Sequence, residues 1–246
     1  MAKVSRLLRC AFFDVFYFIW TTFFSVGMVW TLLLPYRGFM YVTRAYNHGI
    51  YVMEKLFLGL DYEVKGWENF PKDRNVIIAC KHESTYETLK AQLLFPESIM
   101  VLKKELGDIP FWGWYAKKMQ FIFVDRSNLR KAAVSLKQAS KTLAESGKNL
   151  LIYPQGTRVY PSDTPAEKPY KRGIAKLYKG AGLPVVPVAA NTGSYWPRNS
   201  FVKKSGTITF EILPVIEPGL DENTFMQILE EQLETASNRL RDSSKD

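Results

Sequence analysis

Residues 76–87 of this 246-residue chain read VIIACKHESTYE, a short apolar run that leads into a histidine-containing segment. The apolar run, residues 76–80, predicts a buried strand, and residues 85–94 carry a helical pattern. A strand followed closely by a helix is the repeating unit of an α/β fold. His82, one of only two histidines in the chain, therefore stands at the turn between a strand and a helix.

The same alternation continues along the chain after residue 61. Further apolar runs cover residues 99–102, 121–124, 150–153, 185–190 and 207–216, and helical patterns cover residues 128–145 and 172–181. This order predicts an α/β fold with a mostly parallel central sheet flanked by helices. The last run alternates apolar and polar residues, as an edge or antiparallel strand does. A closing amphipathic helix is predicted over residues 221–240, with one apolar face made by Phe225, Leu229, Leu233, Ala236 and Leu240.

The N-terminal part has a different character. Residues 15–34 are twenty uncharged, mainly apolar positions, a length with which a helix crosses a hydrocarbon core of roughly 30 Å. Basic residues flank both ends, so charge does not select an orientation, and a hairpin that returns to the same face fits as well as a full span. Residues 39–60 predict an amphipathic helix in the membrane interface. We therefore predict N-terminal membrane-attachment helices over residues 1–60 and an α/β domain over residues 61–246.

Composition narrows the possible partners. Hydrophobic residues make up 47% and charged residues 23% of the chain, as in globular proteins. The two cysteines and two histidines are too few for a disulfide framework or a zinc site. The net charge of +9 indicates an acidic partner or simply a solvated basic surface. Because the chain has no nucleic-acid-binding motif, anionic lipid headgroups and phosphorylated metabolites remain as partners.

His82 and Glu87 are candidates for a catalytic base and its orienting acid. Histidine titrates near neutral pH, and a carboxylate on one ring nitrogen fixes the tautomer that leaves the other nitrogen free to accept a proton. However, the run Ser84-Thr85-Tyr86-Glu87 is also a capping box, in which the glutamate binds a backbone N–H at the start of a helix. The two roles compete for one carboxylate, and the sequence leaves both open.

A second motif follows the apolar run at residues 150–153 and reads Pro154-Gln155-Gly156-Thr157-Arg158. The glycine permits close backbone approach, the threonine offers a hydroxyl, and the arginine offers a bidentate fork for phosphate. The polar, proline-containing loop at residues 159–171 lies directly after it and is a candidate substrate-contacting loop.

Two other runs carry candidate residues. Arg126 follows the run at residues 121–124, where Asp125 could neutralise it. Pro187 lies in the run at residues 185–190, although proline is unusual in a central strand.

These four blocks, in this order and spacing, resemble those of the glycerolipid acyltransferases, and residues 61–220 look like a bacterial 1-acylglycerol-3-phosphate acyltransferase. In that family the first block is histidine followed five residues later by aspartate, the third is Phe-Pro-Glu-Gly-Thr-Arg, and the fourth centres on Val-Pro-Val. Here glutamate and glutamine stand at positions 87 and 155, where the family usually has aspartate and glutamate.

The resemblance implies that His82 is the base, with Glu87 as its orienting acid. The residues implied in substrate binding are Arg126, Gln155, Gly156, Thr157, Arg158 and Pro187. The reaction implied is transfer of a fatty acyl group from acyl-CoA or acyl carrier protein to the sn-2 hydroxyl of 1-acyl-sn-glycerol 3-phosphate (lysophosphatidic acid), giving phosphatidic acid in phospholipid biosynthesis. The place implied is the bacterial inner membrane, with the active site on its cytoplasmic face.

No metal or organic cofactor is expected, because the acyl thioester is a co-substrate. Membrane lipids are expected partners and nucleic acid is not. Two alternatives stay open at this point. One is acylation of lyso-ornithine lipid or another lyso-lipid, since the two departures put the acceptor in doubt. The other is a catalytically silent membrane lipid-binding protein.

Overall fold

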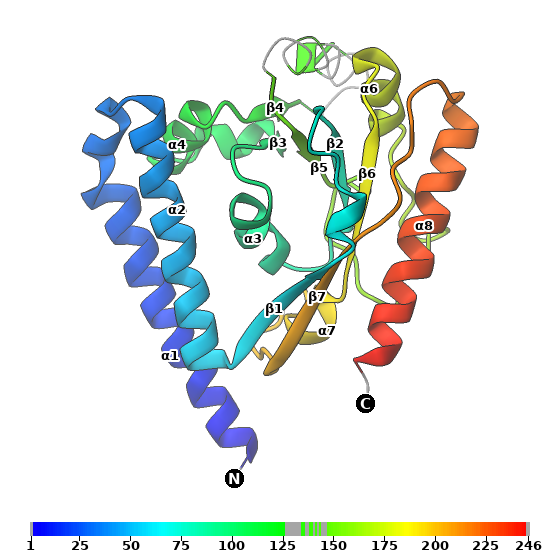
Figure 1. Ribbon diagram of the computed structural model, residues 1–246. Helices are drawn as coiled ribbons and strands as arrows, with labels where there is room; N and C mark the ends of the chain where they lie inside the picture. Colours follow the sequence, from blue (N-terminus) through cyan, green and yellow to red (C-terminus); the bar gives the residue numbers. More distant parts are fainter. Residues whose placement is uncertain are drawn as a thin grey trace.

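The computed structural model describes residues 2–125, 134–135, 138–139, 141, 143 and 147–244. Within these residues seven strands form one sheet in the order β1-β7-β6-β2-β5-β3-β4 (Figure 1). The strands are β1 Leu60–Lys65, β2 Ile77–Cys80, β3 Ile99–Lys103, β4 Ile122–Val124, β5 Leu150–Ile152, β6 Val185–Ala190 and β7 Gly206–Ile212. All neighbouring strands run parallel except β6 and β7. The predicted fold class, a mostly parallel sheet flanked by helices, is confirmed.

Helices cover both faces of the sheet. They are α3 Tyr86–Leu94, α4 Trp112–Lys118, α6 Gly173–Ala181, the short α7 Thr192–Tyr195, and α8 Glu222–Ser243. Strand β2 shows how the two faces are formed, because successive side chains of a strand point to opposite sides. Ile77 and Ala79 pack in one core with α6 and α8, whereas Ile78 and Cys80 pack in the other core with α3. The central strand is thus apolar throughout, as a strand covered on both faces must be.

The chain before the sheet forms a pair of antiparallel helices that lies on the α3 side (Figure 1). Helix α1 covers Ala2–Thr22 and continues as a π-helix, Phe23–Gly27; a 3₁₀ turn, Val29–Leu33, reverses the chain into α2, Tyr36–Met53. A second π-helical turn, Glu54–Leu58, ends α2 just before β1. The chain thus returns to the end of the helix pair at which it began, and the choice between a membrane span and a membrane hairpin stays a prediction. The division into two domains stays a prediction.

Helix α1 presents most of its apolar surface to the outside. Residues Val4–Gly27 are long and apolar enough to cross a membrane, and 11% of that window is buried. Phe18 is 70% exposed, and Val4, Phe12 and Ile19 are each more than half exposed. By contrast, Phe39, Met40 and Ile50 of α2 are buried, and α2 packs against α3. The amphipathic face predicted for the membrane interface is therefore partly a protein contact.

The last part of the chain agrees with its pattern in most respects. All five predicted apolar-face residues of α8 are buried. Strand β7 is antiparallel to β6, as its alternation allowed, but it is not an edge strand, because β1 pairs with its other side. Strand β1 was not predicted; the run 60–65 has only a weak apolar pattern. The helix predicted over residues 128–145 lies largely outside the described residues.

Pro187 lies inside the central strand β6, opposite Ala79 of β2. Proline has no backbone N–H group, so it fits a strand only where the neighbouring strand does not need that hydrogen-bond donor. The Pro187 carbonyl accepts a hydrogen bond from Leu213 at 2.9 Å, and the missing donor faces the same residue. Because β7 has already ended at Ile212, the pairing between β6 and β7 loses no donor within the strand.

Candidate active site

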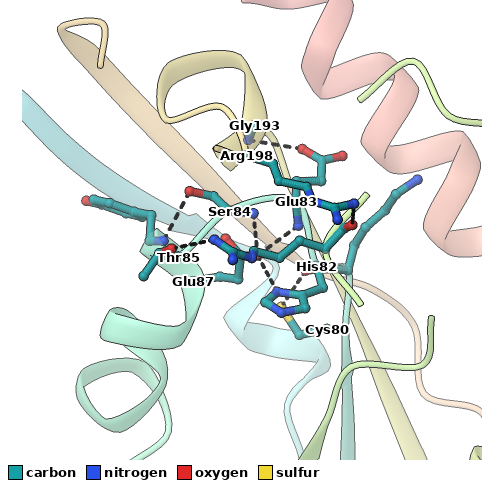
Figure 2. Close-up of polar contacts among 11 residues, drawn as sticks. Cys80, His82, Glu83, Ser84, Thr85, Glu87, Gly193 and Arg198 are labelled. Carbon is teal, nitrogen blue, oxygen red and sulfur yellow. Dashed lines mark hydrogen bonds and ion pairs between the residues drawn. The ribbon is translucent and has the colours of Figure 1, made fainter. Parts of the chain in front are cut away.

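Five residues, 81–85, separate strand β2 from helix α3, and this turn folds back on the carboxylate of Glu87. The Glu87 Oε1 atom lies 2.7 Å from His82 Nδ1 (Figure 2). The same oxygen accepts hydrogen bonds from the backbone N–H groups of Glu83 and Ser84, each at 2.8 Å. Three nitrogen atoms thus converge on one buried oxygen.

Capping and orientation are therefore performed by the same atom. The expectation that the two roles compete is wrong, because Oε1 binds the N–H group of Ser84 at the start of α3 and His82 together. The Ser84 hydroxyl, in turn, accepts a hydrogen bond from Tyr86 N at 3.1 Å. With its proton on Nδ1 and directed at Glu87, the His82 ring keeps Nε2 as the nitrogen that can accept a proton.

The His82 ring is also held on its face. The Tyr153 ring stacks on it with a centroid distance of 4.1 Å and an interplanar angle of 20°. The His82 carbonyl accepts a hydrogen bond from Val159 N at 2.8 Å. The side chain remains 17% exposed, so a substrate hydroxyl can approach a ring whose orientation is fixed.

The hydroxyl and thiol nearest to His82 are unsuited to act as nucleophiles. Ser84 is fully buried, and its oxygen already binds the Tyr86 N–H group. Burial raises the pKa of the Cys80 thiol well above its ordinary value, and the negative charges of Glu87 and Glu83 raise it further. A base without a side-chain nucleophile is suited to activate an alcohol that the substrate itself brings.

The second motif lies beside the first because β5 pairs with β2 in parallel, with Ile77 opposite Leu150. The carboxyl ends of the two strands therefore meet at one edge of the sheet. Gly156 adopts a φ of 72°, a left-handed conformation that favours glycine, and its N–H group donates to Tyr153 O at 2.9 Å. The turn directs Arg158 back to the first motif, where its Nη1 donates to Thr85 Oγ1 at 2.9 Å.

The remaining residues predicted for substrate binding differ in their accessibility. Thr157 is exposed next to Arg158. Gln155 is only 2% exposed and lies under the turn, so its side chain does not line the surface. Pro187 is buried inside β6. Arg126 lies outside the described residues. The catalytic and binding roles of all these residues stay predictions.

Two residues near the site were not singled out from the sequence. Tyr153, the stacking partner of His82, could have been found as the last aromatic residue before the second motif. Arg198 had no such signal, because it lies in the loop after α7. Its Nη1 donates to the carbonyl of Arg158 at 2.5 Å (Figure 2). Its guanidinium lies 5.7 Å from the Tyr160 ring centroid. Arg198 thus places a second cation at the Arg158 turn.

Buried polar contacts support the turn from the α8 side. Glu83 Oε2 accepts a hydrogen bond from Gly193 N at 3.1 Å. Lys81 Nζ pairs with Glu234 of α8 at 2.7 Å, and Tyr170 donates to the same Glu234 oxygen at 2.7 Å. Burial raises the pKa of Glu83 to about 8, against the opposing effect of Lys81.

An apolar cavity of about 210 Å³ begins at Thr88, the residue directly after Glu87. It lies between the N-terminal helices, α3 and α4. Tyr17, Phe24 and Tyr46 line one side, and Leu89 and Trp112 line the other. This arrangement places an apolar space next to the polar His82 turn.

Comparisons with known proteins identify the family of the chain. A family model described as Acyltransferase matches residues 61–191. The 1-acyl-sn-glycerol-3-phosphate acyltransferase of Pseudomonas aeruginosa is 34% identical over 200 residues, which cover 81% of this chain and 75% of that protein. The enzyme of the same name from Saccharomyces cerevisiae is 30% identical over 198 residues, covering 80% of this chain and 64% of that protein.

The fold has a counterpart among solved structures. The crystal structure of the 1-acyl-sn-glycerophosphate acyltransferase of Thermotoga maritima superposes with a TM-score of 0.76 at 24% identity and covers 98% of both chains. At this identity the likeness shows the fold alone. The family model spans both motifs, and together with the Pseudomonas relative it identifies the chain as a member of the acyltransferase family.

Proposed function

We propose that this acyltransferase moves a fatty acyl group from an acyl thioester to the sn-2 hydroxyl of 1-acyl-sn-glycerol 3-phosphate, giving phosphatidic acid. The observation that carries the proposal is the contact between His82 Nδ1 and Glu87 Oε1 at 2.7 Å, with Arg158 bound to the same turn through Thr85. A proton acceptor for an alcohol and a fork for a phosphate thus lie side by side. The names of the relatives support the same acceptor.

The chemistry requires one base. As the acceptor hydroxyl attacks the thioester carbonyl, its proton passes to His82 Nε2, and the negative charge of Glu87 stabilises the imidazolium that forms. The C–S bond then breaks, and the departing thiolate takes up the proton. The acyl group passes directly to the acceptor oxygen, so no acyl-enzyme forms. We expect no metal or organic cofactor.

Substrate binding follows the polarity of the site. Arg158 and Arg198 offer positive charge for the phosphate of the acceptor. The apolar cavity next to α3 suits a fatty acyl chain, because burial of methylene groups favours association. The exposed apolar surface of α1 would keep the site at a membrane, where lyso-lipids reside; we propose the cytoplasmic face of a bacterial inner membrane.

The test is acyl transfer from labelled acyl-CoA and labelled acyl carrier protein, each offered lysophosphatidic acid and lyso-ornithine lipid side by side. We expect labelled phosphatidic acid from the wild type and about 10³-fold less from His82→Ala. If ornithine lipid is the only labelled product, the proposed mechanism stands but the acceptor is lyso-ornithine lipid. If no combination of donor and acceptor gives a product, the proposed activity is wrong, and the alternative of a catalytically silent lipid-binding protein takes its place. The comparison of the two donors identifies which thioester is used.

A further inference from the structure

Helix α3 is held at a second point, one turn after Glu87. Lys90 forms an ion pair with Glu54, and both side chains are completely buried. Glu54 opens the π-helical turn Glu54–Leu58 that ends α2, so the pair joins the N-terminal helices to the helix that carries Glu87. The two residues are 36 positions apart in the sequence.

Aromatic rings from both elements enclose the Lys90 ammonium group. It lies 4.5 Å from the Tyr86 ring centroid on α3 and 5.4 Å from the Tyr51 ring centroid on α2. Such rings attract a cation through their electron-rich faces. The Lys90 ammonium group therefore has three partners, one carboxylate and two aromatic rings, and together they hold it in one position between the helices.

A pair in this place is costly to bury. Burial raises the pKa of Glu54 to about 7 and lowers the pKa of Lys90, so desolvation opposes both charges. Glu54 Oε1 also accepts no hydrogen bond within the part of the chain that the structure describes. Apolar residues of similar size commonly fill such a position without loss of stability. What the ion pair adds is direction, because its hydrogen bond forms only when the two side chains meet in one register of the two helices.

The register matters because of what lies on either side of Lys90. Glu87, three residues earlier, binds His82, and Leu89 and Gln92 line the apolar cavity. The opposite wall of the cavity includes Thr43 and Asn47 of α2. A shift of α2 along α3 would change both the His82–Glu87 contact and the width of the cavity.

We propose that the Glu54–Lys90 pair is a positioning device that locks α2 onto α3, and so aligns Glu87 with His82 and sets the acyl chain length that the cavity accepts. The second part rests on the proposed function. Glu54 and Lys90 touch no substrate; they act through α3.

The test replaces the pair by apolar residues in Glu54→Leu/Lys90→Met. The matched control is Arg44→Gln, which breaks an exposed ion pair that joins α2 to Glu97, just beyond α3, at 3.0 Å. We expect the double variant to unfold near the wild-type temperature but to lose roughly 10- to 100-fold in kcat, because small misplacements of reacting groups cost this much. We also expect its preference among thioesters of different chain length to flatten. The control variant should match the wild type in unfolding temperature, in kcat and in chain-length preference.

Hydrogen–deuterium exchange of the α3 amides, residues 86–94, gives a readout that needs no activity. Exchange should rise in the double variant and not in Arg44→Gln. Should the double variant fail to fold, Glu54→Gln/Lys90→Gln, which removes both charges but keeps a neutral hydrogen bond between similar side chains, takes its place with smaller effects in the same direction. Unchanged exchange, kcat and chain-length preference in a folded variant would overturn the proposal. A wild type without acyl transfer would instead overturn the proposed function, while exchange would still test the lock.

Discussion

Two points on one short helix, α3, are held in different ways. At its start, Glu87 binds His82 and two backbone N–H groups, all within five residues along the chain. One turn later, Lys90 binds Glu54, which comes from the N-terminal helices. The first contact joins residues five positions apart in the sequence, whereas the second joins residues 36 positions apart. The proposed base is thus oriented by a local contact, and the proposed alignment of α3 depends on a distant one.

Loss of the base should have the largest effect. His82→Ala removes the proton acceptor while leaving both Glu87 hydrogen bonds to the backbone, so kcat/KM should fall by about 10³-fold with little change in unfolding temperature. The measurement is transfer of a labelled acyl group, together with a thermal unfolding curve. Activity near the wild-type level in a folded variant would remove His82 from the mechanism.

Glu87 variants separate orientation of the base from capping of the helix. Glu87→Gln keeps the size and one acceptor oxygen for the Glu83 and Ser84 N–H groups, but it removes the charge that stabilises the imidazolium. We expect kcat to fall by about 10²-fold and the fold to persist. Glu87→Ala also leaves two buried donors unpaired, which costs roughly 1–3 kcal/mol of stability each. If the amide and alanine variants unfolded at the same temperature, the capping role would be wrong.

Arg158 tests the phosphate site next to the base. Arg158→Ala should raise the KM for lysophosphatidic acid by about 10-fold, the loss expected for one hydrogen bond to a charged group, with a smaller change in kcat. Arg158→Lys keeps the positive charge but loses the bidentate hydrogen-bonding geometry of the guanidinium. Its KM for lysophosphatidic acid should lie between those of the wild type and Arg158→Ala. Initial rates against acceptor concentration give both constants. An unchanged KM in the alanine variant would place the phosphate elsewhere.

The smallest effect concerns the neighbouring buried carboxyl group of Glu83. Its pKa is raised from 4.5 to about 8 by burial, with Glu87 and Glu234 adding to this and Lys81 opposing it. Between these two values the folded state holds a proton that the unfolded state has lost, so stability falls as pH rises through this window. Glu83→Gln has no such proton. Its unfolding temperature should therefore fall less than that of the wild type between about pH 5 and pH 8; parallel curves would contradict this.

The sequence alone determined the class of fold and the contact between His82 and Glu87. Strand runs such as 185–190 and the apolar face of α8 follow periodicities that depend only on neighbouring residues. The His82–Glu87 pair was predictable for the same reason, since five residues at a helix start bring the two side chains together. Strand β1 was missed because its pattern is weak and its pairing with β7 is distant in sequence.

Only the tertiary structure decided what joins these parts. The stacking of Tyr153 on His82, the contact of Arg198 with the Arg158 turn, and the burial of Gln155 depend on how β5 and the loop after α7 come to lie beside β2. The Glu54–Lys90 pair depends on the docking of α2 against α3. Local periodicity does not predict such contacts, because they depend on the packing of elements that are distant in the chain.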